Sequence, residues 1–188
     1  MLRLWGTAVG LLVAIPLGLY AWDFLEQDAC LDRGGAWFGR LGCQTDLPQI
    51  NYIVINKSQR KLMAFANGEV AAIMTVSLGQ QPVGQKYREG DSRTPEGIYR
   101  ITEHKRDSAY HRALRISYPT AQQMKQAQTK GINPGGDIMI HGLPNGMGAL
   151  GRIHNWADWT KGCIAITDGE IDWLFQSTTK ETVVEILP

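Results

Sequence analysis

A run of 19 residues without a charged side chain, from Leu4 to Trp22, constrains this 188-residue chain more than any other feature. At a rise of about 1.5 Å per residue, a helix over this run is about 28 Å long, enough to cross the hydrocarbon core of a bilayer. Trp5 lies near one end and Tyr20 near the other, where amphipathic rings favour the headgroup level. Residues 1–22 are therefore predicted to form one transmembrane helix.

Two other interpretations of this segment stay open. A cleaved signal peptide would have its apolar region at residues 11–19, but Leu19-Tyr20-Ala21 is a poor match to a small-x-small cleavage site. A buried core helix usually has a polar face, and no polar residue interrupts this run. Because Arg3 precedes the run and acidic residues follow it, the positive-inside rule leaves the N-terminus in the cytoplasm. We expect a single-pass protein of the cytoplasmic membrane whose remaining domain is exported, either periplasmic or otherwise extracytoplasmic.

The three cysteines agree with an oxidising compartment. Cys30 and Cys43 bracket a short loop with four glycines, so a disulfide between them is the natural expectation outside the cytoplasm, with two free thiols as the alternative. Residues 23–49 are accordingly predicted to be a linker that carries this loop. Cys163 is left unpaired, and a free thiol in an exported protein suggests a chemical role.

Composition excludes several functional classes. The formal net charge is +1, from 19 basic and 18 acidic residues with no cluster of basic ones, so the chain lacks the electrostatic footprint of a nucleic-acid-binding protein. No CxxC or HExxH motif occurs. His141, His154, Asp158 and Cys163 match no common zinc-ligand spacing, so neither a metal nor another cofactor is expected.

Residues 50–188 are predicted to form one mainly β domain with a few helices, an α+β sandwich or barrel of about six to eight strands. Asn67-Gly68 is a strong hairpin signal. Thr120 with Gln123, and Thr167 with Glu170, have the spacing of capping boxes that begin two helices. The strands are expected at residues 51–56, 61–66, 70–78, 98–102, 137–140 and 182–187, and the helices at 122–128 and 171–175.

Cys163 and His141 are the residues best placed for chemistry. Gly162 allows close backbone approach before the thiol, and Lys161 is positioned to lower the pKa of that thiol. His141 ends an apolar strand and precedes Gly142, a position that suits a general base whose second ring nitrogen bonds a backbone carbonyl. The competing interpretations are a small buried cysteine and a histidine satisfied inside the core.

Other polar residues give weaker signals. Arg112, Arg115 and Tyr118 are candidates to meet a substrate carboxylate, although an ordinary half-exposed strand is the simpler interpretation. His104 and His111 flank a basic stretch and are expected on a solvated surface. The glycine-containing loop 143–159 has the composition of a lid over the cysteine.

Several motifs together resemble the L,D-transpeptidase catalytic domain, the YkuD-type fold of bacterial cell-wall enzymes, over about residues 50–188. The motifs are the Asn67-Gly68 hairpin, Ser77-Leu78-Gly79, residues 82–84, residues 90–99, Ile140-His141-Gly142 and Thr160-Lys161-Gly162-Cys163. The resemblance implies a YkuD-like domain behind one N-terminal helix. It also implies peptidoglycan stem peptides as the substrate and a membrane as the other partner.

The resemblance also implies roles for single residues. Cys163 would attack the carbonyl carbon of an L,D peptide bond, His141 would take the thiol proton, and the Gly142 carbonyl would orient the imidazole. Backbone N–H groups around Gly162 and Cys163 would hold the oxyanion. Contacts to the substrate would come from Thr160, Lys161, Tyr118 and Arg115.

The sequence departs from the family motif beside the cysteine. Lys161 stands where the family usually has a histidine, and Ala165 stands where it usually has an arginine. These changes leave the nucleophile and the base in place. Because they lie beside the cysteine, they are expected to affect which substrate and which acceptor the protein prefers. Transfer to an amine is therefore the expected reaction, with an L,D-carboxypeptidase or amidase acting on the same bonds, or a non-catalytic wall-binding protein, as alternatives.

Overall fold

The computed structural model describes residues 25–26, 29–30, 36–37 and 43–188, in two compact units divided between Leu47 and Pro48. The predicted helix over residues 1–22 lies outside these ranges. Within the described residues, none of the helices has the length and apolar character needed to cross a bilayer.

The first unit contains a two-stranded antiparallel sheet. Strand β1 (Ala36–Trp37) pairs with β2 (Cys43–Gln44), and Trp37 lies opposite Cys43. Cys43 forms a disulfide with Cys30, which is the pairing expected from the sequence. The two cysteines are 13 positions apart in the sequence.

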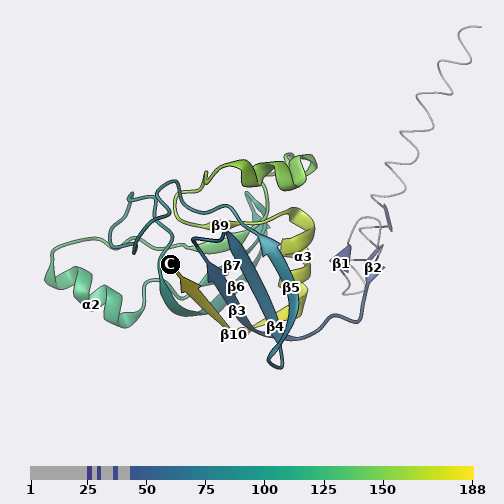
Figure 1. Cartoon of the computed structure of the whole chain (residues 1–188), viewed down its shortest axis with the longest axis horizontal. Helices are drawn as coiled ribbons and strands as arrows, with labels where there is room; N and C mark the ends of the chain where they lie inside the picture. Colours follow the sequence, from purple (N-terminus) through teal and green to yellow (C-terminus); the bar gives the residue numbers. More distant parts are fainter. Residues whose placement is uncertain (1–24, 27–28, 31–35, 38–42) are drawn as a thin grey trace, which may run out of the picture. The chain divides into compact units, whose positions relative to one another are not determined.

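The second unit is an eight-stranded curled sheet with strand order β5-β4-β3-β10-β6-β7-β8-β9 (Figure 1). The pairs β10–β3 and β8–β9 are parallel, and the others are antiparallel. The prediction of a mainly β domain with a few helices is confirmed. Its strands are β3 (Ile50–Asn56), β4 (Lys61–Ala66), β5 (Glu69–Thr75), β6 (Gly97–Ser108), β7 (His111–Ile116), β8 (Met139–His141), β9 (Ile164–Ala165) and β10 (Thr178–Leu187).

Local sequence signals set the turns and helix starts. Asn67 and Gly68 have φ values of 52° and 86°, the left-handed conformations that a tight hairpin between β4 and β5 requires. Both capping boxes are present, at Thr120 before α2 (Ala121–Thr129) and at Thr167 before α3 (Asp168–Ser177). The caps therefore lie where the sequence predicts, although α3 begins at Asp168, three residues before the predicted start at residue 171.

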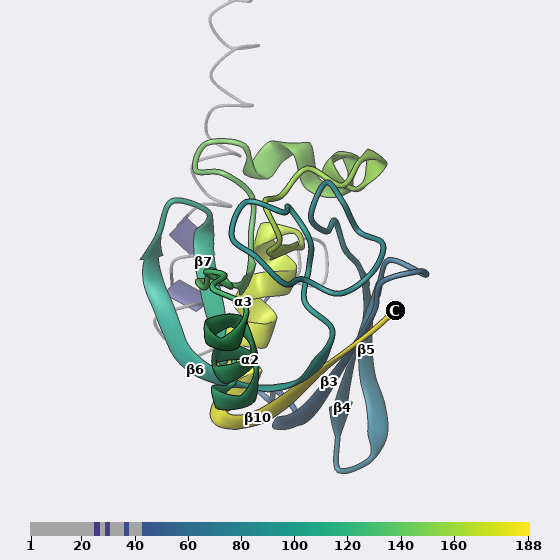
Figure 2. The same cartoon turned by 90° about the vertical axis from the view of Figure 1, so that its left-hand side faces the viewer.

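Helix α3 lies between the two halves of the curled sheet, with β6 and β7 on one side and β3, β4 and β5 on the other (Figure 2). Its apolar side chains are buried, and the strands that it contacts most are β7 and β8. The most deeply buried side chains include Ile50, Ile53, Ile55, Leu62, Tyr99, Ile101, Leu114, Ile140, Ile164, Ile171 and Leu174.

Strand β5 ends earlier than predicted, at Thr75 instead of residue 78. Two residues later, Ser77 leaves β4 and exchanges two backbone hydrogen bonds of 2.9 Å with Ala165 of β9. This pairing joins segments that are far apart in the sequence, so no pattern of neighbouring residues predicts it. It brings residues 77–79 to the end of the sheet that carries Cys163.

Candidate active site

Strands β8 and β9 deliver the two candidate catalytic residues to one place. They pair in parallel, with Ile140 opposite Ile164 and His141 opposite Ala165, and Cys163 immediately precedes β9. Both side chains line a cavity of about 370 Å³. The other residues of its wall are Lys105, Ser108, Ala109, Tyr110, Asp137, Met139, Trp159, Thr160 and Lys161.

His141 is held as a neutral imidazole with a defined orientation. It is 4% exposed, and its Nδ1 lies 2.7 Å from the Gly142 carbonyl oxygen. Because a carbonyl only accepts, Nδ1 carries the proton and Nε2 keeps its lone pair. Burial lowers the pKa of His141, and the nearby His154 lowers it further, while the Gly142 contact opposes the change.

Gly142 occupies a position that has no room for a side chain. A Cβ there would lie 2.7 Å from Asp168 Oδ1 and 3.1 Å from the Cβ of His111. Asp168 Oδ1 also accepts a 2.8 Å hydrogen bond from the Leu143 N–H, which fixes the backbone directly after Gly142. The N-terminal end of α3 therefore supports the carbonyl that orients His141.

Two aromatic rings enclose the imidazole, and sequence reasoning did not assign either of them to the site. The Tyr110 ring centroid lies 4.5 Å from that of His141, and the Trp159 centroid lies 5.8 Å away. Tyr110 sits in the turn between β6 and β7, and Trp159 comes four residues before the cysteine. Nothing in the sequence next to His141 indicates these contacts, because the two rings come from a turn and a loop elsewhere in the chain.

The turn before Cys163 is fixed by Thr160 and Gly162. Thr160 Oγ1 donates to the Cys163 carbonyl at 2.7 Å and accepts from the Gly162 N–H at 3.1 Å. Gly162 has a φ of 125°, and a Cβ there would lie 2.6 Å from the Arg93 carbonyl oxygen. The Thr160 hydroxyl is thus used within the turn, although Thr160 lines the cavity. The Gly162 N–H, which the resemblance implies as an oxyanion donor, already has Thr160 Oγ1 as its acceptor.

The Cys163 thiol is free and only partly exposed. Its Sγ donates to the Asp137 carbonyl at 3.6 Å. Burial raises the pKa of Cys163, and Asp137 adds to the rise, while a backbone hydrogen bond with Met139 and the charge of Lys86 oppose it.

This result corrects the expectation that Lys161 lowers the pKa of the thiol. The net shift is upward, and the cation that opposes it is Lys86, a buried residue paired with Asp91 at 2.7 Å. Lys161 is exposed and lines the cavity beside Cys163. The short sequence distance between Lys161 and Cys163 favours Lys161 as the cation that acts on the thiol. In the folded protein, Lys86 acts on the thiol instead, from a loop that is remote in sequence.

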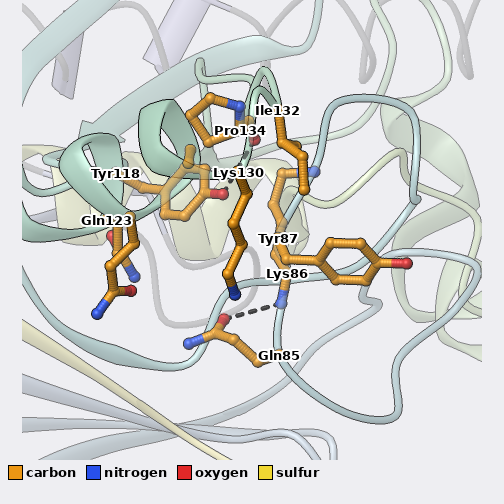
Figure 3. A pocket seen from close by; sticks show the side chains of 10 residues that line it. Gln85, Lys86, Tyr87, Tyr118, Gln123, Lys130, Ile132 and Pro134 are labelled. Atoms are coloured by element: carbon orange, nitrogen blue, oxygen red, sulfur yellow. Dashed lines mark hydrogen bonds between the residues drawn. The ribbon is translucent and has the colours of Figure 1, made fainter.

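Arg115 and Tyr118 do not line this cavity. Arg115 lies on β7, where its Nη1 is 2.8 Å from Asp137 Oδ1 and its Nε is 3.0 Å from Glu103. It reaches the site only through Asp137. Tyr118 follows β7 and donates to the Pro134 carbonyl at 3.0 Å inside a different cavity (Figure 3).

His104 and His111 are not the solvated surface residues that the sequence suggests. His104 Nε2 lies 3.1 Å from the Thr178 carbonyl oxygen, and its ring packs on Phe175. His111 Nε2 lies 2.8 Å from the fully buried Asp172, which raises the pKa of His111. His104 contacts Phe175 of α3 and Thr178 of β10, and His111 contacts Asp172 of α3. The basic residues next to them in the sequence give no indication of these contacts.

The loop 143–159 contains a short 3-10 helix, η2 (Gly148–Trp156), interrupted at Gly151. Ser77 Oγ donates to the His154 carbonyl at 3.0 Å and lies 3.2 Å from His154 Nδ1. Asp158 pairs with Arg60 at 2.8 Å. In the part of the chain that is described, no group of three or more His, Cys, Asp or Glu residues is arranged to hold a metal ion.

Comparisons with known proteins agree with this geometry. A family model described as the L,D-transpeptidase catalytic domain (YkuD) matches residues 50–186. The putative L,D-transpeptidase YafK of Escherichia coli K12 is 31% identical over 99 residues, which are 52% of this chain and 32% of that protein. The match thus spans about a third of the length of this curated relative.

Solved structures share the fold. The helical cell shape determining protein Pgp2 (K307A mutant) of Campylobacter jejuni superposes with a TM-score of 0.56 at 23% identity, covering 74% of this chain and 47% of that one. Bd1075 of Bdellovibrio bacteriovorus has a TM-score of 0.53 at 22% identity, covering 77% and 49%. With a family model that covers most of the chain and a matching sheet, this protein belongs to the L,D-transpeptidase (YkuD) catalytic domain family.

Proposed function

We propose that this protein is a cysteine-dependent acyltransferase, an L,D-transpeptidase that acts on stem peptides of peptidoglycan outside the cytoplasmic membrane. One observation carries the proposal: the Cys163 thiol and the His141 imidazole line the same cavity from adjacent, paired strands. Family membership supports the reaction class. The Cys30–Cys43 disulfide supports export to an oxidising compartment, with residues 1–22 as the anchor.

In the first half-reaction, Cys163 Sγ attacks the carbonyl carbon of a stem-peptide bond while His141 Nε2 takes the thiol proton. The carbonyl electron pair moves to oxygen, and the oxyanion is held by the Cys163 N–H, because the Gly162 N–H is engaged by Thr160. Collapse of this intermediate breaks the C–N bond. The imidazolium gives its proton to the leaving amine, and a thioester on Cys163 remains.

In the second half-reaction, an acceptor amine attacks the thioester carbon. His141 Nε2 takes a proton from that amine and returns one to the departing sulfur, so a new amide forms and the thiol is restored. Water in place of the amine gives a carboxylate, the outcome of a carboxypeptidase or amidase. The chemistry of Cys163 and His141 is the same in both cases.

The pKa shifts favour a neutral resting pair. Burial raises the pKa of Cys163 and lowers the pKa of His141, so thiol and imidazole are both uncharged near neutral pH. Proton transfer therefore accompanies the attack, and a preformed thiolate is not required. The Gly142 carbonyl then stabilises the imidazolium that forms during the step.

Intact-mass analysis tests this proposal. The purified protein is incubated with a tetrapeptide stem, with and without an amine acceptor, and a mass gain on Cys163 is expected that Cys163→Ala abolishes. Cross-linked product identifies a transpeptidase, and shortened peptide alone identifies a hydrolase. A thiol that gains no mass from the stem or from a carbapenem-type probe refutes the enzymatic proposal and leaves a wall-binding role.

A further inference from the structure

A second cavity, of about 410 Å³, lies beside helix α2 and takes no part in the proposed chemistry (Figure 3). Its lining combines apolar and aromatic side chains with the amides of three glutamines and the ammonium groups of two lysines. The residues that line it are Gln85, Lys86, Tyr87, Tyr118, Gln123, Gln126, Ala127, Lys130, Ile132 and Pro134. This volume is in the range of cavities that hold small ligands or short peptide segments.

The polar wall of this cavity is held in place by its own hydrogen bonds. Gln85 Oε1 accepts from the N–H groups of Lys86 and Glu96, both at 2.8 Å. Gln123 closes the capping box of α2 and donates to the Tyr99 hydroxyl at 2.9 Å. The dashed line in Figure 3 is the bond between Lys86 and Gln85. Because the side chains of Gln85 and Gln123 are already hydrogen-bonded in the free protein, they lose little conformational entropy when a ligand binds.

Lys130 is the cation left free at this cavity. Its side chain is exposed and extends toward the part of the wall formed by Gln85 (Figure 3). Among the described residues, no acidic group pairs with Lys130, and no carboxylate lines the cavity, whereas the ammonium of Lys86 is already paired with Asp91. An unpaired ammonium in a lining that also contains apolar side chains favours a ligand that combines a carboxylate with apolar groups.

The second cavity has a neighbour on the side of Cys163. A third cavity, of about 490 Å³, is lined by Lys86, which also lines the second cavity, and by Lys161, which also lines the cavity of Cys163. The three cavities are thus linked by shared lining residues. An extended substrate that reacts at Cys163 is expected to pass these residues on its way to Lys130.

We propose that the cavity beside α2 binds a carboxylate-bearing peptide segment of the substrate, remote from the reacting bond, with Lys130 as the group that recognises the carboxylate. The inference rests on the proposed function, since it takes the substrate to be a peptide with free carboxylates. It adds a binding site on α2 that the catalytic residues do not require. The site recognises an acidic peptide and not a neutral sugar.

Equilibrium binding to the full-length Cys163→Ala protein tests this site without turnover. The probes are a tetrapeptide stem with free carboxylates, the same peptide with its carboxylates amidated, and a neutral N-acetylglucosamine oligomer. We expect the free-carboxylate peptide to bind most tightly, and Lys130→Ala to weaken that binding about fivefold or more. Lys130→Arg keeps the charge and is expected to bind within about twofold of the parent.

Lys125→Ala is the matched control, because Lys125 is an exposed lysine of α2 that does not line the cavity, five positions before Lys130 at the C-cap of that helix. It removes the same charge and is expected to leave binding unchanged. Equal losses in Lys125→Ala and Lys130→Ala, equal binding of the amidated peptide, tighter binding of the sugar oligomer, or no peptide binding each overturn the site. Since no step needs the thiol, failure here leaves the mass-gain test of Cys163 unaffected, and the reverse also holds.

Discussion

His141 Nδ1 donates a 2.7 Å hydrogen bond to the carbonyl oxygen of Gly142, its own neighbour in the chain. A backbone group thus orients the imidazole, and Asp168 holds that backbone through the Leu143 N–H. The arrangement leaves Nε2 unprotonated. It needs a residue without a side chain at position 142, because Asp168 occupies the space where a Cβ would lie.

Replacement of the base tests this orientation. We expect His141→Ala to lower the rate of Cys163 acylation by at least about 100-fold, the usual contribution of a positioned general base. The rate is measured as mass gain per unit time with the tetrapeptide stem. His104→Gln is the control, since His104 bonds to Thr178 away from the cavity, and its rate should stay within about twofold. A near-normal rate in His141→Ala would remove this histidine from the mechanism.

Gly162 provides a test of the turn before the nucleophile. Gly162→Ala places a Cβ 2.6 Å from the Arg93 carbonyl oxygen at a φ of 125°, so we expect a loss of about 3 kcal/mol or more in unfolding free energy. Gly146→Ala is the matched control, because Gly146 also has a positive φ, of 84°, but has no atom within 4 Å of the point where a Cβ would lie. It should lose only about 1 kcal/mol.

Urea unfolding measures both variants. Equal losses would mean that backbone conformation alone, and not the close approach to Arg93, makes glycine necessary at position 162. In that case the tight packing of the cysteine turn against residues 92–94 would contribute little to stability.

The features that the sequence predicts well are those set by neighbouring residues. The Asn67-Gly68 hairpin and the capping boxes at Thr120 and Thr167 depend on side chains within a few positions, and all three are present. The pattern of buried and exposed residues on β3 likewise follows from its alternating sequence.

The environment of the site depends instead on distant contacts. Tyr110 and Trp159 reach His141 from a turn and a loop, and Lys86 acts on Cys163 across 77 positions of sequence. The residues next to His141 and Cys163 in the sequence do not predict these contacts. The sequence therefore predicts that the nearby Lys161 lowers the pKa of Cys163, whereas in the folded protein Lys86 has this effect.

The pH dependence of thiol reactivity tests the electrostatic roles of the two lysines. Because burial raises the pKa of Cys163, alkylation by a neutral reagent should increase with pH around a midpoint above that of an ordinary cysteine. Lys86 opposes this rise, so Lys86→Met should move the midpoint further upward. Lys161→Ala should leave it unchanged.

The Lys86 variant also removes the partner of Asp91, so its fold is checked by thermal unfolding. The double variant Lys86→Met/Asp91→Asn avoids a buried unpaired carboxylate and should show the same upward movement. A midpoint that moves in Lys161→Ala but not in either Lys86 variant contradicts the assignment.

His111 links β7 to α3 through the buried carboxylate of Asp172. The hydrogen bond to Asp172 raises the pKa of His111 above its ordinary value of 6.5, so its contribution to stability is complete below pH 6.5 and is lost as pH rises through the folded-state pKa. His111→Gln should therefore lower the unfolding free energy by about 1–3 kcal/mol at acidic pH and by less at alkaline pH.

His104 gives the opposite sign and serves as the control. Burial lowers the pKa of His104, so the folded state favours its neutral form and wild-type stability falls as pH drops below 6.5. His104→Gln should therefore cost less at acidic pH than at alkaline pH. Urea unfolding at about pH 5.5 and about pH 8.5 separates the two trends. If the loss in His111→Gln is the same at both values, the contact with Asp172 does not depend on the charge of the imidazole, and the link between β7 and α3 is a neutral hydrogen bond.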